Sequence, residues 1–190
     1  MIKKITHMMA EFDPLVKIIE IVKINENSEV YRVKREGKNY ILKVARENSF
    51  SRSQLAYERK ILPLLKLVKG VTHLVKDYYG SLDAILKEYF EGLDVNAYAT
   101  YGKTLDVRAE MQMQETVREI HSRKIANLDL KFENFIISLD GTEARLIDLG
   151  TAKKYNWLSK RRFNCELEWD LKQLEGIIHK LRFTQVAFDD

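Results

Sequence analysis

Alternation between apolar and polar residues indicates strands in the first half of the chain. From Glu29 to Ala45 the sequence EVYRVKREGKNYILKVA alternates on both sides of REGKN, where Gly37 and Asn39 provide turn residues. This pattern predicts a β-hairpin. The segments HLVKDYYG and DAILKEYF indicate two further strands, joined through residues 80–81. We therefore expect a small antiparallel sheet in this half.

Apolar residues at three- and four-residue steps predict helices elsewhere. SQLAYERKILPLLKLV has this spacing after Ser53, which could cap the helix, and Pro63 marks an end or a kink. VRAEMQMQETVREIHSRK and WDLKQLEGIIHKLRF keep the spacing over several turns, so the second half reads as mostly helical. Near the N-terminus, DPLVKIIEIV opens with Asp13 and Pro14 in the order of a helix start, yet its later residues also fit a strand. Both interpretations stay open.

A second hairpin carries residues suited to chemistry. NFIISL and ARLIDL flank DGT, so two short strands should meet at an Asp-Gly turn. The polar stretch NLDLKFENF enters the first strand with Asp129, Lys131 and Asn134, and Asp148 follows the second strand. Because a hairpin brings its ends together, Asp129 and Asp148 should lie near each other and would repel unless a cation intervenes. Carboxylate and carboxamide oxygens suit Mg²⁺, and with Lys131 beside them they favour phosphoryl transfer.

Length and composition fit one globular domain or two small lobes. The 190 residues are 45% hydrophobic and 32% charged, with only 2 Pro and 8 Gly, which argues against a disordered tail or a fibrous repeat. The single Cys165 cannot form an intramolecular disulfide, and the sequence has no signal peptide pattern and no run of about 18 apolar residues. We expect a cytoplasmic protein without a membrane span. The net charge of +4 suits solubility better than nucleic-acid binding.

The polar stretch belongs to a longer segment that resembles a known family. IHSRKIANLDLKFENFII is similar, position by position, to the catalytic-loop region of protein kinases. The resemblance implies that Asp129 is the catalytic base, that Lys131 contacts the γ-phosphate and that Asn134 is a magnesium ligand. LIDLGTAK resembles the DFG segment of the family, which makes Asp148 the second metal ligand and puts Leu149 in place of Phe.

Further similarity lies towards the N-terminus. NYILKVA resembles the strand that bears the phosphate-binding lysine, which would be Lys43, and Glu58 in AYERKIL fits the helix residue that pairs with it. AILKEYFEG resembles the hinge, where the backbone around Glu88 and Phe90 would hydrogen-bond adenine. Lys87 would then occupy the position that gates the back of the nucleotide pocket. A lysine is unusual there and could reach a carboxylate.

The glycine-rich loop of the family is replaced by KINENSEVY. Asn25 and Ser28 stand where the family usually has glycine, and we expect them to contact the nucleotide, because Asn tolerates left-handed backbone and Ser can bond a phosphate. Asn127 and Leu128 replace the family's His and Arg before the catalytic aspartate. The lost arginine argues against switching by phosphorylation of an activation loop.

The C-terminal part resembles a shortened kinase lobe. WDLKQLEGII is similar to the helix whose aspartate, here Asp170, supports the catalytic loop, although Asp170 could instead cap the last helix. Few residues separate Gly150 from Asp170, and no APE-like segment lies between them. Most of the usual peptide-docking surface is therefore absent, as in RIO-type kinases, the small KEOPS kinase and some bacterial effector kinases.

The resemblance implies an α+β, two-lobed protein kinase-like fold. Residues 1–90 would form the N-lobe, a small antiparallel sheet plus a helix that binds ATP, and residues 91–190 a reduced, mainly helical C-lobe. The expected function is transfer of the γ-phosphoryl group of MgATP to a hydroxyl, with protein Ser/Thr as the preferred acceptor and a protein partner supplying recognition. A catalytically silent scaffold, a small-molecule kinase and an ATPase switch in a complex stay as alternatives. A secreted effector acting in a host cytosol also stays open.

Overall fold

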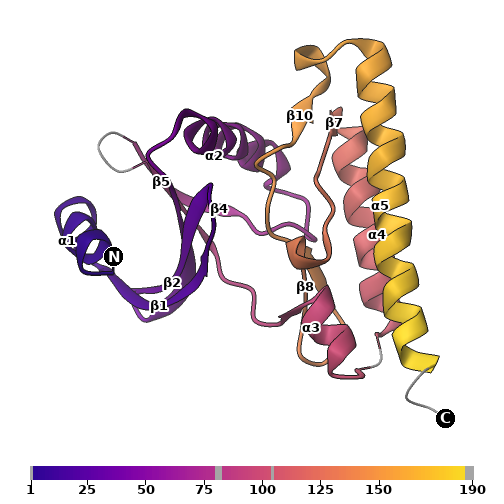
Figure 1. Ribbon diagram of the computed structural model, residues 1–190, viewed down its shortest axis with the longest axis horizontal. Helices are drawn as coiled ribbons and strands as arrows, with labels where there is room; N and C mark the ends of the chain where they lie inside the picture. Colours follow the sequence, from indigo (N-terminus) through magenta and orange to yellow (C-terminus); the bar gives the residue numbers. More distant parts are fainter. Residues whose placement is uncertain (1, 80–82, 104, 187–190) are drawn as a thin grey trace. The chain divides into compact units, whose positions relative to one another are not determined.

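A computed structural model describes residues 2–79, 83–103 and 105–186. The chain divides into two compact units, each of which is described by itself below. Unit 1 consists of residues 1–63 and 73–89, and unit 2 of residues 64–72 and 90–190. The architecture belongs to the predicted α+β class (Figure 1). Among the described helices, none is both long and apolar enough to cross a membrane.

Unit 1 is built on the predicted antiparallel sheet. Its strands lie in the order β1-β2-β3-β5-β4, and each neighbouring pair is antiparallel. The strands are β1 (Val16–Ile24), β2 (Ser28–Arg35), β3 (Lys38–Ala45), β4 (Leu74–Tyr78) and β5 (Ala84–Glu88). The hairpin predicted around REGKN is confirmed, with Glu36 and Gly37 at positive φ in its turn. The predicted junction between the last two strands, residues 80–81, lies outside the described residues.

The N-terminal segment differs in part from the sequence expectation. Helix α1 (Ile2–Phe12) was not predicted, and the ambiguous segment after Asp13 is the edge strand β1. Asp13 does not start a helix. Its buried carboxylate accepts hydrogen bonds from Lys76 Nζ at 2.7 Å and Tyr78 Oη at 2.9 Å, and Arg35 Nε lies 3.3 Å away. Asp13 therefore links the start of β1 to β2 and β4.

Helix α2 (Ser49–Ile61) begins earlier than expected. The cap is Asn48, whose side chain accepts a hydrogen bond from Ser51 N at 2.7 Å, and the predicted cap Ser53 lies inside the helix. The prediction was wrong because Asn48 is an equally good cap and stands closer to the first buried turn. The helix packs against β3 and β5, and Glu58 lies on its buried face.

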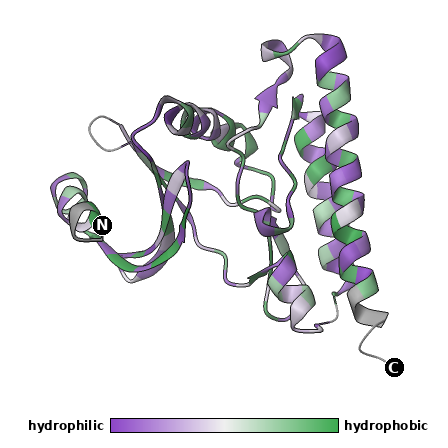
Figure 2. Cartoon of the chain, in the orientation of Figure 1, coloured by the Kyte–Doolittle hydropathy of each residue, from purple (hydrophilic) through white to green (hydrophobic). Residues whose placement is uncertain are grey.

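Unit 2 is mainly helical. The long helices α4 (Val107–Ser122) and α5 (Lys160–Val186) pack against each other, and the short helix α3 (Val95–Thr100) packs against α5 (Figure 1). Apolar and polar segments alternate along both long helices, as expected for helices with one buried face (Figure 2). The remaining elements are short: β6 (Leu93–Asp94), β7 (Ile125–Ala126), η2 (Phe132–Asn134), β8 (Phe135–Ile137), β9 (Ala144–Leu146), β10 (Lys153–Lys154) and η3 (Tyr155–Trp157).

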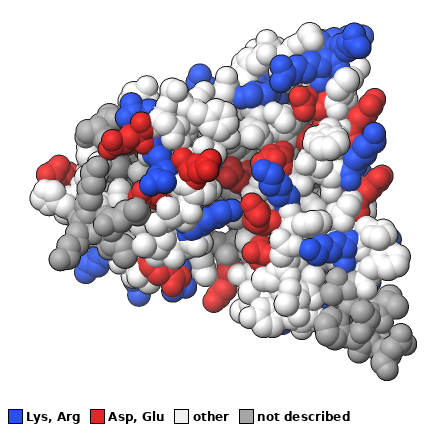
Figure 3. Space-filling view, in the orientation of Figure 1, with Lys and Arg blue, Asp and Glu red and all other residues white. Residues whose placement is uncertain are grey.

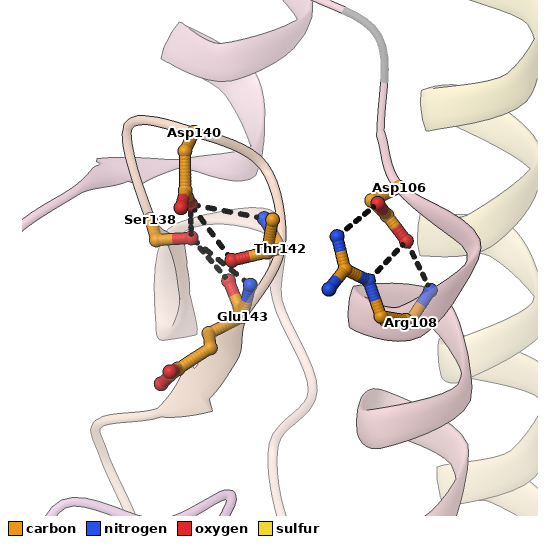
Figure 4. A network of polar contacts seen from close by, with 6 residues as sticks. All are labelled: Asp106, Arg108, Ser138, Asp140, Thr142 and Glu143. Carbon is orange, nitrogen blue, oxygen red and sulfur yellow. Dashed lines mark hydrogen bonds and ion pairs between the residues drawn. The ribbon is translucent and has the colours of Figure 1, made fainter.

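The predicted second hairpin is formed by β8 and β9, and its turn is closed by side chains. Asp140 Oδ1 accepts hydrogen bonds from the hydroxyls of Ser138 at 2.6 Å and Thr142 at 2.9 Å, and from Thr142 N at 3.1 Å (Figure 4). Gly141 adopts a φ of 75°, which glycine tolerates without strain. In the same view, Asp106 caps α4 by accepting from Arg108 N. The ordered turn fixes the register of the two strands whose other ends carry Asn134 and Asp148.

Candidate functional site

The predicted site residues of unit 1 centre on a buried carboxylate held by two lysines. Glu58 Oε2 lies 2.7 Å from Lys43 Nζ, and Glu58 Oε1 lies 2.6 Å from Lys87 Nζ. The side chains of Lys43, Glu58 and Lys87 are 9%, 0% and 5% exposed. We name these three residues the buried triad. The structure thus contains the predicted ion pair, and Lys87 also reaches a carboxylate.

Strand register explains why the two lysines meet one carboxylate. Lys43 on β3 pairs with Ile85 on β5, and Lys87 on β5 pairs with Ile41 on β3. Lys43 and Lys87 are therefore diagonal neighbours on one face of the sheet, within reach of the same group. Helix α2 packs on this face and supplies Glu58 from its buried side. The triad carries a formal charge of +1.

Three predicted site residues of unit 2, Asp129, Lys131 and Asn134, lie on residues 127–134, which we name the polar loop. Asn127 and Asp129 have φ values of 62° and 52°, in the left-handed region that costs free energy for residues other than glycine. Residues keep this backbone conformation where contacts with neighbouring groups hold it in place. Here Asp170 accepts hydrogen bonds from Leu128 N at 2.8 Å and Asn127 N at 3.0 Å, and it lies 2.9 Å from His121 Nε2.

The position of Asp170 decides between its two predicted roles. Helix α5 begins at Lys160, so Asp170 lies in its interior and does not cap it. Its side chain is fully buried and holds the polar loop. One turn further along the helix, Gln173 Oε1 accepts from Leu130 N at 3.1 Å. Sequence reasoning missed Gln173, although its spacing of three residues from Asp170 places both on one helix face.

A second missed residue ties the polar loop to the segment after Asp148. Thr151 donates its hydroxyl to the Asn127 carbonyl at 2.8 Å, and Asn127 Nδ2 donates to the Thr151 carbonyl at 2.9 Å. Asn127 and Leu128 stand where protein kinases have His and Arg, and that difference does not predict this reciprocal pair of hydrogen bonds. The pair of hydrogen bonds also holds in place the segment that follows Asp148. No pattern in the sequence signals this contact.

The charged and amide side chains of the loop converge. Lys131 Nζ lies 2.9 Å from Asp129 Oδ2, and Asn134 Nδ2 donates to the Asp129 carbonyl at 2.8 Å. The hydrogen bond with Asp129 raises the pKa of Lys131, against the effect of desolvation, and the charges of Asp129, Glu133 and Asp148 add to the rise. Lys131 therefore stays protonated near neutral pH, and its charge interacts with all three carboxylates.

Two of these residues can ligate a divalent cation. Asn134 Nδ2 is engaged by the Asp129 carbonyl, which leaves Oδ1 as the atom suited to a metal. Asp148 Oδ1 accepts from Gly150 N at 2.9 Å, and Ile147 N bonds the Asn134 carbonyl, so the hairpin carries both residues at one end. Within the described ranges, no three His, Cys, Asp or Glu residues form a metal cluster. The role of Asn134 and Asp148 as magnesium ligands stays a prediction.

The other residues predicted to contact the nucleotide make interactions within the protein. Asn25 Oδ1 accepts from Asn27 N at 2.8 Å and Ser28 N at 2.7 Å, which closes the turn between β1 and β2. Glu88 N donates to the His73 carbonyl at 3.0 Å, and the Arg145 guanidinium lies 4.6 Å from the centre of the Phe90 ring. The roles of Asn25, Ser28, Glu88 and Phe90 in nucleotide binding stay predictions.

A groove of about 390 Å³ lies in unit 2 next to the polar loop. Lys131 and Glu133 line it from the loop, and Gln173 and Ile177 line it from α5. The floor is largely apolar, while Lys131 brings a positive charge to its edge. The groove is a place where a further group could lie beside Lys131.

The chain was compared with known families. The family described as protein kinase domain matches residues 24–169. The matched segment contains the buried triad, the polar loop and Asp148, and it ends one residue before Asp170. No curated protein matches the chain.

Proposed function

The chain belongs to the protein kinase domain family, and from this premise we propose that it transfers the γ-phosphoryl group of MgATP to a hydroxyl acceptor. The observation that carries the proposal is the arrangement of the polar loop. Asp129, Lys131 and Asn134 are held together by hydrogen bonds, and the loop is fixed from below by the buried Asp170. Such pre-organisation is what phosphoryl transfer requires of a protein.

Each residue has a defined task in this proposal. Asp129 accepts the proton of the acceptor hydroxyl while the hydroxyl oxygen bonds to the γ-phosphorus, and the bond from phosphorus to the bridging oxygen breaks, which releases ADP. Lys131 offsets the negative charge that the phosphoryl oxygens carry. Lys43 binds the α- and β-phosphates. Asn134 and Asp148 would hold Mg²⁺, which neutralises phosphate charge when bound.

The preferred acceptor is a serine or threonine hydroxyl of a protein. Support comes from the DLK sequence of the loop, which lacks the arginine found in the corresponding loop of tyrosine kinases. The groove beside Lys131 adds support, because it offers an apolar surface where an acceptor segment could lie with its hydroxyl near Asp129. A protein partner would supply the rest of the recognition.

The alternative is a silent scaffold that binds a partner without phosphoryl transfer. One observation favours it. Phosphates approach the backbone most closely at glycine, which has no side chain, whereas the turn from Asn25 to Ser28 carries side chains. An ATPase that acts as a switch in a complex is a further alternative. It would release phosphate without labelling an acceptor.

Transfer from γ-labelled ATP to casein and to a serine/threonine peptide library tests the proposal. Wild type should label an acceptor, and Asp129→Asn and Asp148→Ala should lower the rate at least about a hundredfold. Glu115→Gln, which removes an exposed carboxylate on α4, should keep the wild-type rate. Phosphate release without acceptor labelling would point to the ATPase. Equal transfer rates for wild type and all variants, with no MgATP binding by calorimetry, would contradict the proposal and support the silent scaffold.

A further inference from the structure

The segment that follows Asp148 carries positive charge that the proposed mechanism does not use. From Gly150 to Cys165 the sequence contains basic residues and no acidic residue. The basic residues, which we name the basic patch, are Lys153, Lys154, Lys160, Arg161 and Arg162. We propose that the basic patch binds acidic residues that flank the acceptor hydroxyl, so that the preferred acceptor is an acidic protein segment. The inference rests on the proposed function, because it names the class of acceptor used at the same site.

Two elements that contact β7 bring the members of the patch together. Strand β10, which consists of Lys153 and Lys154, pairs with β7, and helix α5 also packs against β7. Burial lowers the pKa of Lys153 to about 8, and the charge of Arg162 adds to the lowering, so the two cations lie close enough to repel. Figure 3 shows basic side chains gathered over the start of α5. An anionic ligand would offset the repulsion between these cations.

The start of α5 is an unfavourable place for basic residues on structural grounds alone. The N-terminus of a helix carries a partial positive charge, so acidic residues stabilise its first turn and basic residues destabilise it. Helix α5 begins with Lys160, Arg161 and Arg162 and has no acidic residue in this turn. All three are exposed, and only the last of them pairs within its helix, with Glu166 at 3.5 Å. Helix stability does not account for these cations, whereas binding of an anion does.

The patch lies within reach of an acceptor placed at the polar loop. Lys153 pairs with Ala126, and Cα atoms of paired residues lie about 5 Å apart. Asp129 follows three residues after Ala126, which adds at most about 11 Å. The Cα atoms of Lys153 and Asp129 are therefore at most about 16 Å apart, and an extended segment covers this span in about five residues. The hydrogen bonds between Asn127 and Thr151 hold the two segments together.

The extent of the patch favours a protein segment over a nucleic acid as its ligand. A nucleic-acid-binding protein usually offers a basic stripe or face that follows many phosphates. Here the patch covers one short strand and the first turn of one helix. Elsewhere on the face in view acidic and basic side chains are interspersed, and the net charge is only +4 (Figure 3). A few carboxylates on an acceptor segment match a patch of this size.

Phosphoryl transfer to two serine peptides tests the inference. One peptide has glutamates on both sides of the serine, and the other has glutamines. Wild type should show a kcat/KM at least about tenfold higher for the glutamate peptide, mainly through a lower KM. Arg161→Glu should lower this preference at least about threefold, again through KM. The matched control is Lys38→Glu on β3, which makes the same change of charge at an exposed lysine and should keep the wild-type preference.

A charge reversal separates recognition from a structural effect. Arg161→Glu places an acidic residue in the first turn of α5, where it favours the helix, so the variant should fold. With Lys160→Glu added, a peptide flanked by lysines should become a better acceptor than the glutamate peptide, which structural damage would not produce. Equal kcat/KM of wild type for the glutamate and glutamine peptides would overturn the inference. Equal losses for both peptides in Arg161→Glu would overturn it as well.

Binding measured without transfer distinguishes this inference from the proposed function. Fluorescence anisotropy gives the Kd of the labelled glutamate peptide for Asp129→Asn, and adding Arg161→Glu should raise this Kd at least about threefold. A Kd that does not respond to Arg161→Glu would overturn this inference alone. Peptide binding that does respond, in a protein whose wild type transfers no phosphate, would overturn the proposed function and support the patch. Single-stranded RNA that displaces the peptide and binds more tightly would overturn the choice of a protein segment.

Discussion

Three buried carboxylates connect elements that are far apart in the sequence. Asp13, Glu58 and Asp170 are at most 3% exposed, and each bonds at least two donors from other elements. A buried charge with good partners contributes little net stability over an apolar residue, but its removal leaves those partners unsatisfied. These residues therefore determine where β1, α2 and the polar loop lie within their units.

The stability of unit 1 should depend on pH through Asp13. Burial alone would raise the pKa of Asp13, but hydrogen bonds from Lys76 and Tyr78 and the charges of Lys76 and Arg35 outweigh it, so the pKa is lowered. A lowered pKa means that the unfolded chain binds the proton more tightly. The stabilisation from Asp13 is complete above the unfolded pKa of about 4 and is lost as the pH falls through the folded pKa.

Asp13→Asn should test this dependence. We expect it to lower the free energy of unfolding by about 2–4 kcal/mol at pH 7, because Lys76 and Arg35 lose the negative charge that they pair with, and by less at pH 3. Urea unfolding at the two pH values gives the comparison. Glu26→Gln, an exposed substitution in the neighbouring turn, should change stability by less than about 0.5 kcal/mol at both. An equal loss at pH 7 and pH 3 would contradict the assignment.

Elements with a clear periodic pattern were predicted well. The β2–β3 and β8–β9 hairpins, the helix α4 and the part of α5 from Trp169 onward follow directly from alternation and from three- and four-residue spacing, whereas residues 160–168 of α5 were not predicted. The start of β1 stayed ambiguous because Asp13 and Pro14 imitate a helix start, whereas Asp13 is in fact used for contacts with β2 and β4. The left-handed backbone of the polar loop has no periodic signal, since it is imposed by contacts with α5.

The link between α5 and the polar loop predicts a local effect of Asp170→Ala. The amides of Asn127 and Leu128 would lose their acceptor, at a cost of about 1–3 kcal/mol each. Hydrogen exchange of these amides should accelerate, and the kcat for phosphoryl transfer should fall while the Kd for ATP changes little. Asp170→Asn keeps one acceptor oxygen and should recover part of the loss. Unchanged exchange in the loop would contradict the link, and Glu168→Ala on the exposed side of α5 serves as the control.

At the scale of the whole molecule, surface charge is mixed. Figure 3 shows acidic and basic side chains interspersed on the face in view, in keeping with a net charge of only +4. Lys160, Arg161 and Arg162 form a short basic run that is exposed at the start of α5. The resemblance found the charged residues of both units, since these stand in short fixed motifs. It could not find Thr151 or Gln173, whose partners are distant in the sequence.

Binding of MgATP should stabilise the whole protein by mass action. A ligand at one hundred times its Kd adds about 2.7 kcal/mol, which for a chain of this size raises Tm by about 5–10 °C. The shift should shrink when EDTA removes the metal, and Asp148→Ala should abolish the difference between ATP with and without Mg²⁺. Differential scanning fluorimetry measures it, with Glu115→Gln as the control. An identical shift with and without Mg²⁺ in wild type would contradict metal binding by Asn134 and Asp148.

The turn between β1 and β2 has a consequence for the thermodynamics of binding. Asn25 closes this turn with its own side chain, and Ser28 is already buried there before any ligand arrives. A flexible glycine-rich segment loses conformational freedom when it folds over a nucleotide, whereas this turn loses that freedom when the protein itself folds. Association with a nucleotide would therefore carry a smaller entropic penalty, and the rigid turn would fix the shape of the ligand it accepts.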